Sequence, residues 1–177
     1  MTVIDPQAPV VARAEVEVRA SPPQVWSVLA DIAEWPTWNP VVRSVTLQGE
    51  LESGTTFRRA AGQGTILGRL LEVDAPRALV WRDRSLGLRA IHAWRLEERP
   101  GGCAVTTEAS LSGLPARLLP GRMRRLTQQE LEAWVHLLKL EVEVRAADSG
   151  PADSGPADSG PADSGPAEEG DAGASAT

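Results

Sequence analysis

Six short segments with the composition of β-strands follow one another between Val41 and Ser112, and one long amphipathic helix comes after them. Turns rich in glycine, proline and small polar residues separate the six segments. Antiparallel strands need only such short connections, so the pattern predicts an antiparallel meander. The predicted strands are Val41–Gln48, Thr55–Ala60, Thr65–Val73, Ala78–Ser85, Leu88–Glu97 and Cys103–Ser112.

The segment before the meander predicts a seventh strand and two short helices. Apolar and charged side chains alternate between residues 10 and 20, as in a strand with one buried face and one solvated face. Ser21-Pro22-Pro23-Gln24 has the form of a helix N-terminus, with Ser21 as the cap and Gln24 at the capping-box position. A second short helix is predicted around Asp31–Trp35, where Pro36 stops or kinks it.

The last predicted element is a helix from about Arg122 to Arg145, after a short turn at Pro115–Leu119. Its apolar side chains recur at helical spacing and form one broad face. They are Thr127, Leu131, Trp134, Val135, Leu138 and Val142. A strongly curved sheet wrapped around this helix would bury that face. We therefore expect an α+β fold in a single domain over residues 10–146, after a flexible N-terminus at residues 1–9.

The segment 147–177 differs from the rest of the chain. The unit Ala-Asp-Ser-Gly-Pro occurs four times in succession from Ala147, with no Val, Leu, Ile or aromatic residue to bury. We predict a disordered acidic tail, which either solubilises the protein or binds a protein partner. Seven of the 24 acidic residues lie in 148–177, so residues 1–147 hold 18 basic and 17 acidic side chains. The net charge of −6 therefore belongs to the tail.

Several classes of protein are disfavoured by composition and motifs. Cys103 is the single cysteine, which excludes an internal disulfide, and two histidines and one cysteine are too few for a convincing zinc site. We find no phosphate-binding loop, no nucleophile elbow, no signal peptide and no apolar run long enough to span a membrane. The near-neutral body argues against nucleic-acid binding. We expect a cytoplasmic protein without a metal or nucleotide cofactor.

Three stretches carry a family resemblance: Ser21–Trp26 with Trp35–Pro40, Gly87–Trp94, and Gly101–Ser110 ending at Gly113. With the final helix they cover about residues 10–146. They resemble the helix-grip (SRPBCC) superfamily of START domains, Bet v 1-like plant allergens and polyketide cyclase/dehydrase proteins, and most closely the bacterial polyketide cyclase-like group. The resemblance implies a curved seven-stranded antiparallel sheet around a long C-terminal helix. Binders, transporters and enzymes share that scaffold.

His92 is the titratable residue of most interest. In the strand Leu88–Glu97 it shares a face with Trp94, and that face should point into the concave side of the sheet. An imidazole there could exchange a proton with a bound carbonyl compound, or it could be a neutral core histidine. Glu108 and Ser110 lie on the next strand and could pair with the neighbourhood of His92. The alternative face of that strand, which includes Ala109, is equally apolar.

Aromatic side chains are predicted to line a cavity between the sheet and the helix. Flat apolar walls suit aromatic, polyketide or sterol-like ligands, although ordinary core packing is the alternative for each ring. The predicted lining residues are Phe57, Trp81, Trp94, Ser110, Trp134 and Leu138.

Arginines interleave with leucines between Leu114 and Leu126, where the chain enters the final helix. Such a basic amphipathic segment either makes transient contact with an anionic membrane or is the solvated start of a helix.

Three functions follow from these features. The first is binding, and with it transport, of a small hydrophobic molecule between sheet and helix. The second is a cyclase/dehydrase (lyase-type) enzyme with His92 as acid or base and Glu108 orienting it. The third is an interaction module that works through the acidic tail.

Overall fold

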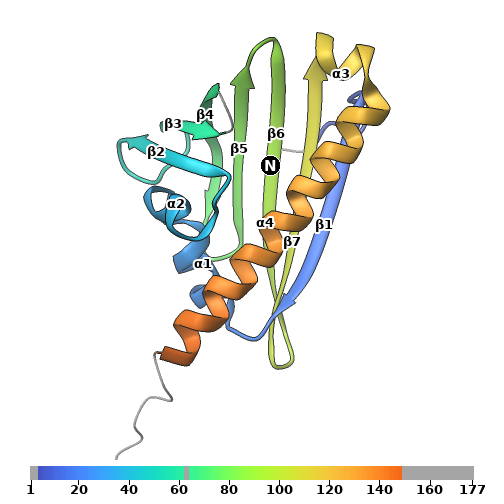
Figure 1. Ribbon diagram of the computed structural model, residues 1–177. Coiled ribbons are helices and arrows are strands. Elements are labelled where there is room, and N and C mark those ends of the chain that lie inside the picture. Colours follow the sequence, from blue (N-terminus) through green and yellow to red (C-terminus); the bar gives the residue numbers. More distant parts are fainter. Residues whose placement is uncertain (1–3, 62–63, 149–177) are drawn as a thin grey trace, which may run out of the picture.

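The computed structural model describes residues 4–61 and 64–148, whose seven strands form one antiparallel sheet that curves against a long helix (Figure 1). The strands follow the order β1-β7-β6-β5-β4-β3-β2, so β1 and β2 form the two edges. Their bounds are β1 Val10–Val18, β2 Val42–Gln48, β3 Thr56–Ala61, β4 Gly64–Asp74, β5 Ala78–Ser85, β6 Leu88–Arg99 and β7 Gly102–Gly113. The predicted helix-grip architecture is confirmed.

Short helices fill the corner between β1 and β2. They are α1 (Pro22–Leu29), the 3₁₀ helix η1 (Ile32–Glu34) and α2 (Trp35–Trp38). The Gln24 side chain accepts a hydrogen bond from the Ser21 backbone N–H at 2.9 Å, which satisfies a free donor at the start of α1. Pro36 does not stop the second helix as expected. It lies in the first turn of α2, where proline is tolerated because its missing N–H would have no partner there.

The concave face of the sheet packs against the apolar face of α4 (Pro120–Asp148). All six side chains predicted for that face are buried. Cross-strand partners such as Ala12 and Ala109, or Val16 and Val105, point into the same core. Trp35 occupies the centre of this core, with ring-centroid distances of 5.8 Å to Phe57 and 5.2 Å to Trp134. The interior beneath α1 and α2 is therefore filled by aromatic rings.

Gly68 makes room for this aromatic packing. It lies opposite Phe57 on the neighbouring strand. A Cβ atom at Gly68 would overlap three carbons of the Phe57 ring, so the ring occupies the space that a side chain would need. Only glycine permits this close approach.

Three polar side chains of α4 cover the open edge of β1. The Gln128 amide donates to the Arg13 carbonyl oxygen at 2.8 Å and accepts from the Arg13 N–H at 3.3 Å. Lys139 Nζ donates to the Glu17 carbonyl oxygen at 2.7 Å, and Glu143 accepts from the Arg19 N–H at 3.0 Å. An uncovered edge strand would invite pairing with another chain. Here the side chains of α4 form hydrogen bonds with backbone N–H and C=O groups that a further strand would otherwise pair with.

The ends of α4 differ from the prediction. The helix begins at Pro120, two residues earlier than expected, and follows a separate short helix, α3 (Leu114–Leu118). It ends at Asp148 and so includes the first two residues of the acidic repeat. The rest of the predicted tail lies outside the described residues. No helix of the described part is long and apolar enough to cross a membrane.

Candidate functional site

Three polar side chains meet inside the concave face of the sheet: Arg59 from β3, Asp83 from β5 and His92 from β6. They are only 4%, 5% and 8% exposed. Side chains two residues apart on a strand point to the same face of the sheet. Arg59 therefore points inward with Phe57, and Asp83 points inward with Trp81. Burying a charge is costly unless it is paired, and here the charges of Arg59 and Asp83 pair with each other.

The hydrogen bonds of Asp83 are distributed unequally between its two oxygens. Asp83 Oδ2 accepts from Arg59 Nη2 at 2.6 Å and from Trp81 Nε1 at 3.4 Å, and it lies 3.4 Å from His92 Nε2. Asp83 Oδ1 and Arg59 Nε are both buried and have no hydrogen-bond partner among the described residues. An acceptor and a donor are thus left over in one buried ion pair.

Aromatic rings hold the cluster in place. The imidazole of His92 stacks on Trp81, with ring centroids 5.3 Å apart and planes 20° apart. The Arg59 guanidinium carbon lies 6.0 Å from the centroid of the Trp134 ring, at the outer limit of a cation–π contact. The His92 imidazole is thus packed against Trp81, and Arg59 lies beside Trp134.

Burial lowers the pKa of His92 below its usual value of 6.5. The Asp83 carboxylate opposes this shift, while the Arg59 guanidinium adds to it. The imidazole is therefore neutral at pH 7. If Nε2 carries the proton and donates it to Asp83, Nδ1 is the free basic nitrogen.

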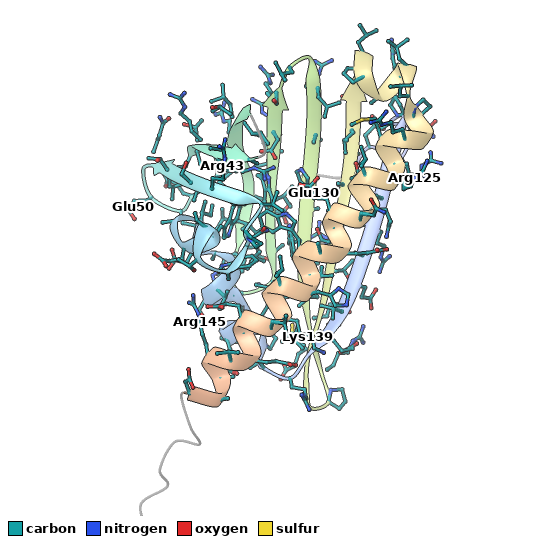
Figure 2. The ribbon with its side chains drawn as sticks, viewed as in Figure 1. Arg43, Glu50, Arg125, Glu130, Lys139 and Arg145 are labelled. Carbon is teal, nitrogen blue, oxygen red and sulfur yellow. The ribbon has the colours of Figure 1, made fainter. Side chains whose placement is uncertain are left out.

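A small cavity borders this cluster between the sheet and the first half of α4. Its volume is about 100 Å³. One of its lining residues is the exposed Glu130, which Figure 2 labels on α4. Its walls are Arg59, Ile66, Asp83, Ser85, Leu88, Ala90, His92, Leu111, Thr127 and Glu130. A space of only about 10 Å³ continues toward Trp81, Trp94 and Trp134. The larger cavity holds roughly three water molecules at about 30 Å³ each.

The expected aromatic-lined cavity is much smaller than the sequence suggested. Trp81, Trp94 and Trp134 do border the narrow space beside His92. Phe57 and Leu138 are fully buried and lie among the packed core residues. The reason is Trp35, whose ring packs against those of Phe57, Trp81 and Trp134 and fills this part of the interior. Trp35 was not assigned to the core from the sequence.

Glu108 and Ser110 lie on the opposite face of the sheet from His92. The register pairs His92 with Ala109, so the neighbours of Ala109 on β7 point outward. The expectations that Glu108 orients His92 and that Ser110 lines the interior cavity are therefore wrong. Asp83 is the carboxylate beside His92.

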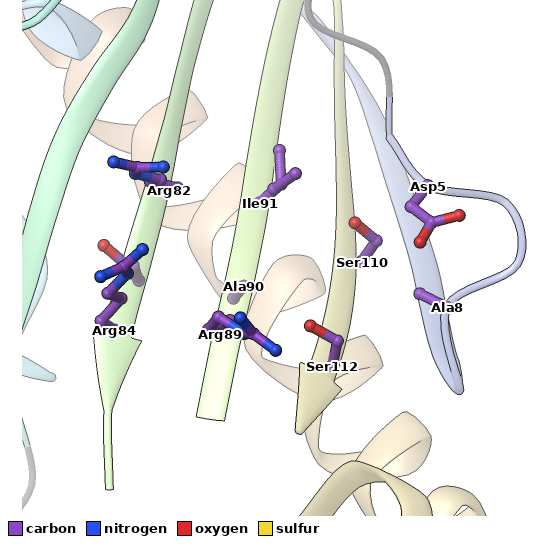
Figure 3. Close-up of a pocket in the computed structure, with 10 residues that line it drawn as sticks. Asp5, Ala8, Arg82, Arg84, Arg89, Ala90, Ile91, Ser110 and Ser112 are labelled. Atoms are coloured by element: carbon purple, nitrogen blue, oxygen red, sulfur yellow. The ribbon is translucent and has the colours of Figure 1, made fainter. Parts of the chain in front are cut away.

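Ser110 instead belongs to a pocket of about 290 Å³ on the outer face of the sheet (Figure 3). Arg82 and Arg84 from β5, Arg89 from β6 and Ser112 from β7 share this pocket with it. It is separated from the His92 cluster by the sheet itself.

The alternation of inward and outward side chains along the strands could have identified Asp83 and Arg59 from the sequence. In Trp81-Arg82-Asp83-Arg84 the two arginines alternate with an inward tryptophan and an inward aspartate, and in Phe57-Arg58-Arg59 the second arginine takes the inward parity. A charged residue at an inward position is unusual and marks a candidate site.

Other chemistries find little support in the described residues. They contain no group of three or more histidine, cysteine or carboxylate side chains placed to hold a metal ion. Cys103 is buried, and burial raises the pKa of its thiol, which disfavours it as a nucleophile.

Comparison with solved structures agrees with this fold. A START superfamily protein from Mycobacterium smegmatis aligns with a TM-score of 0.66 and 19% identity, over 76% of this chain and 98% of that one. The di-domain ARO/CYC protein of the steffimycin biosynthetic pathway aligns with a TM-score of 0.66 and 15% identity, over 78% of this chain and 53% of that one. At these identities the likeness concerns the fold alone.

Comparison of sequences identifies the family. An uncharacterized protein of Mycobacterium tuberculosis is 29% identical over 148 residues, which cover 79% of this chain and 89% of that protein. The family described as polyketide cyclase/dehydrase and lipid transport matches residues 9–143, from the start of the sheet to near the end of α4. The chain therefore belongs to the polyketide cyclase/dehydrase and lipid transport family.

Proposed function

We propose that the protein binds, and thereby carries, a small hydrophobic molecule with one hydroxyl group, between the sheet and the first half of α4. The hydroxyl lies at the Arg59–Asp83 pair and the apolar part extends toward Leu88 and Leu111. The observation that carries the proposal is the unpartnered donor and acceptor, Arg59 Nε and Asp83 Oδ1, in a buried ion pair that borders a cavity. Buried polar groups without partners are rare in proteins.

A hydroxyl fits this pair better than a carboxylate does. A hydroxyl both donates and accepts, so it is a suitable partner for either atom, Asp83 Oδ1 or Arg59 Nε. A carboxylate would only accept, and its charge would lie near those of Asp83 and Glu130. The charge of Arg59 is already balanced by Asp83 at 2.6 Å. A neutral ligand is therefore favoured.

The size of the cavity limits what enters it at rest. Ligand pockets commonly measure about 300–1,000 Å³, whereas this one measures about 100 Å³. A single small ring fits, or the polar end of a longer molecule whose remainder displaces the half-buried Leu88. A larger ligand requires α4 and the β5–β6 turn to move apart.

The test compares phenol, toluene and benzoate, three single-ring probes that differ in one substituent. We expect phenol to bind most tightly, measured by quenching of tryptophan fluorescence and by ligand-observed NMR. In the double variant R59M/D83L both charges are replaced by apolar side chains of similar length, and phenol should lose about 10- to 30-fold in affinity, close to the value of two hydrogen bonds. Toluene should bind at least as well as before.

A matched control is the exposed ion pair between Asp74 and Arg77 at the turn from β4 to β5. The double variant R77M/D74L should leave phenol affinity unchanged. Equal binding of toluene and phenol to the parent protein, or equal loss in both double variants, would refute the role of the Arg59–Asp83 pair.

A second candidate is a cyclase/dehydrase-type enzyme with His92 as its acid or base. The observation that favours it is the pairing of His92 Nε2 with Asp83 Oδ2, which orients the imidazole beside the cavity. His92→Gln keeps most of the side-chain shape but does not titrate near pH 7. Turnover of a bound hydroxylated polyketide should then fall about 10²–10⁴-fold if His92 transfers a proton, while affinity changes little.

A further inference from the structure

We propose that one end of the molecule docks onto the surface of an anionic lipid bilayer. This end, called the tip surface here, is formed by the β5–β6 turn, α3 and the start of α4, and it occupies the top of Figure 1. Its residues are the exposed leucines Leu86, Leu114, Leu118, Leu119 and Leu126 and the arginines Arg84, Arg89, Arg117, Arg122, Arg124 and Arg125.

The exposed leucines are the first observation. Leu86 is 93% exposed, and the other four are between 51% and 68% exposed. Single exposed leucines are ordinary on protein surfaces, but a group of them at one end marks an interaction site.

Leu86 is unfavourable for the fold as well as for solvation. It has φ = 44° and precedes Gly87, which has φ = 75°. Two successive positive φ angles in a two-residue hairpin turn favour Asn-Gly, because a leucine side chain is strained in the left-handed region. Neither the turn geometry nor packing in the core favours a leucine at position 86. Contact of its side chain with a surface outside the protein would explain it.

The turn and α3 form one continuous surface. Leu88 pairs with Gly113, the residue just before α3. A Cβ atom at Gly113 would collide with the Gly87 carbonyl oxygen, so the turn lies directly against the start of α3. Leu86 and Leu114 therefore lie beside the same backbone junction.

Charge is the second observation. Residues 84–89 and 113–129 contain six arginines and no acidic residue. Without these six, the remainder of residues 1–147 has 12 basic and 17 acidic side chains. None of the six makes an ion pair within the described part of the chain. Figure 2 shows Arg125 on the first turns of α4, where a positive charge opposes the helix dipole.

An anionic bilayer satisfies both observations at once. Leucines enter the boundary between headgroups and acyl chains, and arginines contact lipid phosphates. A second copy of the chain would instead bring two arginine-rich surfaces together. Asp5 shares the outer-face pocket with Arg84 and Arg89, and Glu130 follows Leu126 one turn later on α4. These two carboxylates are fewer than the six arginines, so two copies of the surface would still carry a large excess of positive charge.

The tip surface also adjoins the cavity. Ser85, Leu88 and Thr127, which line the cavity, belong to the same turn and helix start. A docked tip surface would therefore place the cavity beside the bilayer, from which an apolar ligand could be taken up without crossing water.

The experiment is co-sedimentation of the full chain with vesicles of phosphatidylcholine alone or with 30% phosphatidylglycerol, at about 50 mM and 500 mM salt. We expect binding to the anionic vesicles, weakened by salt. The double variant R124Q/R125Q should bind more than tenfold more weakly, since each arginine near an anionic surface contributes about fivefold. The exposed R77Q/R99Q pair, far from the tip surface, is the matched control and should bind as the parent does.

Leu86→Asn gives the sharpest test because its two effects have opposite signs. Asparagine suits the turn, so the melting temperature should stay the same or rise, while binding to anionic vesicles falls at least threefold. Leu140 is an exposed leucine on α4, outside the tip surface. Leu140→Asn is therefore the control for the loss of apolar surface. Phosphatidylglycerol carries headgroup hydroxyls, so the cavity variant R59M/D83L is measured as well. Unchanged vesicle binding of that variant separates the tip surface from the cavity, whereas a loss equal to that of R124Q/R125Q would assign the binding to the cavity.

Three further outcomes would overturn the proposal. One is equal binding to both vesicle types, and another is no binding to either. The third is concentration-dependent dimerisation in analytical ultracentrifugation that Leu86→Asn abolishes, which would assign the tip surface to a second copy of the chain.

Discussion

Replacing Gly68 with alanine should destabilise the fold by overpacking its aromatic core. The added methyl group would overlap the Phe57 ring, well inside the 3.4–4 Å of ordinary van der Waals contact. Phe57 cannot retreat, because Trp35 and Trp81 lie with ring centroids 5.8 and 6.4 Å away. Overpacking of this kind costs about 1–3 kcal/mol, and this site should lie near the upper limit. The entropic advantage of alanine over glycine returns about 0.5–1 kcal/mol.

The expected net loss is therefore about 2 kcal/mol, or a fall of roughly 6–10 °C in melting temperature for a domain of this size. Thermal unfolding followed by circular dichroism, with urea unfolding for the free energy, measures both quantities. Gly64→Ala on the same strand is the control, since nothing lies within 4 Å of its added methyl group. It should leave stability unchanged or slightly higher.

A double-mutant cycle with Phe57→Leu tests the cause. A smaller side chain opposite Gly68 should accept the methyl group, so the two substitutions together should cost at least 1 kcal/mol less than their sum. The reasoning fails if Gly68→Ala melts within about 1 °C of the parent, or if the cycle shows no coupling.

The remaining predictions concern the buried cluster and the acidic segment. The lowered pKa of His92 means that the unfolded chain takes up a proton before the folded chain does as pH falls below 6.5. The contribution of His92 to the free energy of unfolding is therefore fully present above pH 6.5. It falls by at most about 1.4 kcal/mol per pH unit below pH 6.5 and levels off below the pKa of the folded state. Between pH 5 and 7.5, the unfolding free energy from urea titrations should therefore fall more steeply with decreasing pH in the parent than in His92→Gln. Asp83→Leu alone leaves Arg59 buried and unpaired and should cost about 3–5 kcal/mol, whereas R59M/D83L recovers most of that loss; equal stability of the two variants in urea would contradict this. Removing residues 149–177 should change the melting temperature by less than about 4 °C, because this segment has no Val, Leu, Ile or aromatic side chain to bury in a core. A larger fall in calorimetry would mean that it packs on the body.

Periodicity predicted the fold well because each element depends on local pattern. The strand Ala78–Ser85 was predicted to the residue, and the other strands to within two residues at each end. The helix ends were less certain from the sequence. Proline can stop a helix or begin one, and Pro36 and Pro120 both lie in first turns.

The site was predicted only in part, because its geometry depends on pairing across distant strands. Alternation placed His92 on the concave face, but the facing of β7 depends on the register between His92 and Ala109. Arg59 and Asp83 lie 24 residues apart, and nothing local to either residue indicates the other. The size of the cavity depends on Trp35, whose indole N–H donates to the Leu29 carbonyl oxygen at the end of α1, a contact that no local pattern in the sequence indicates.

The covered edge of β1 constrains how the cavity can open. Gln128, Lys139 and Glu143 bind α4 to the β1 edge at three points along the helix. The cavity lies between α4 and strands β3–β7. Lifting α4 straight off the sheet would break all three contacts. A rotation of α4 about the β1 edge would keep them, so an opening that preserves these contacts would use β1 as its hinge line. The mouth then widens most where Glu130 and Thr127 face the β5–β6 turn.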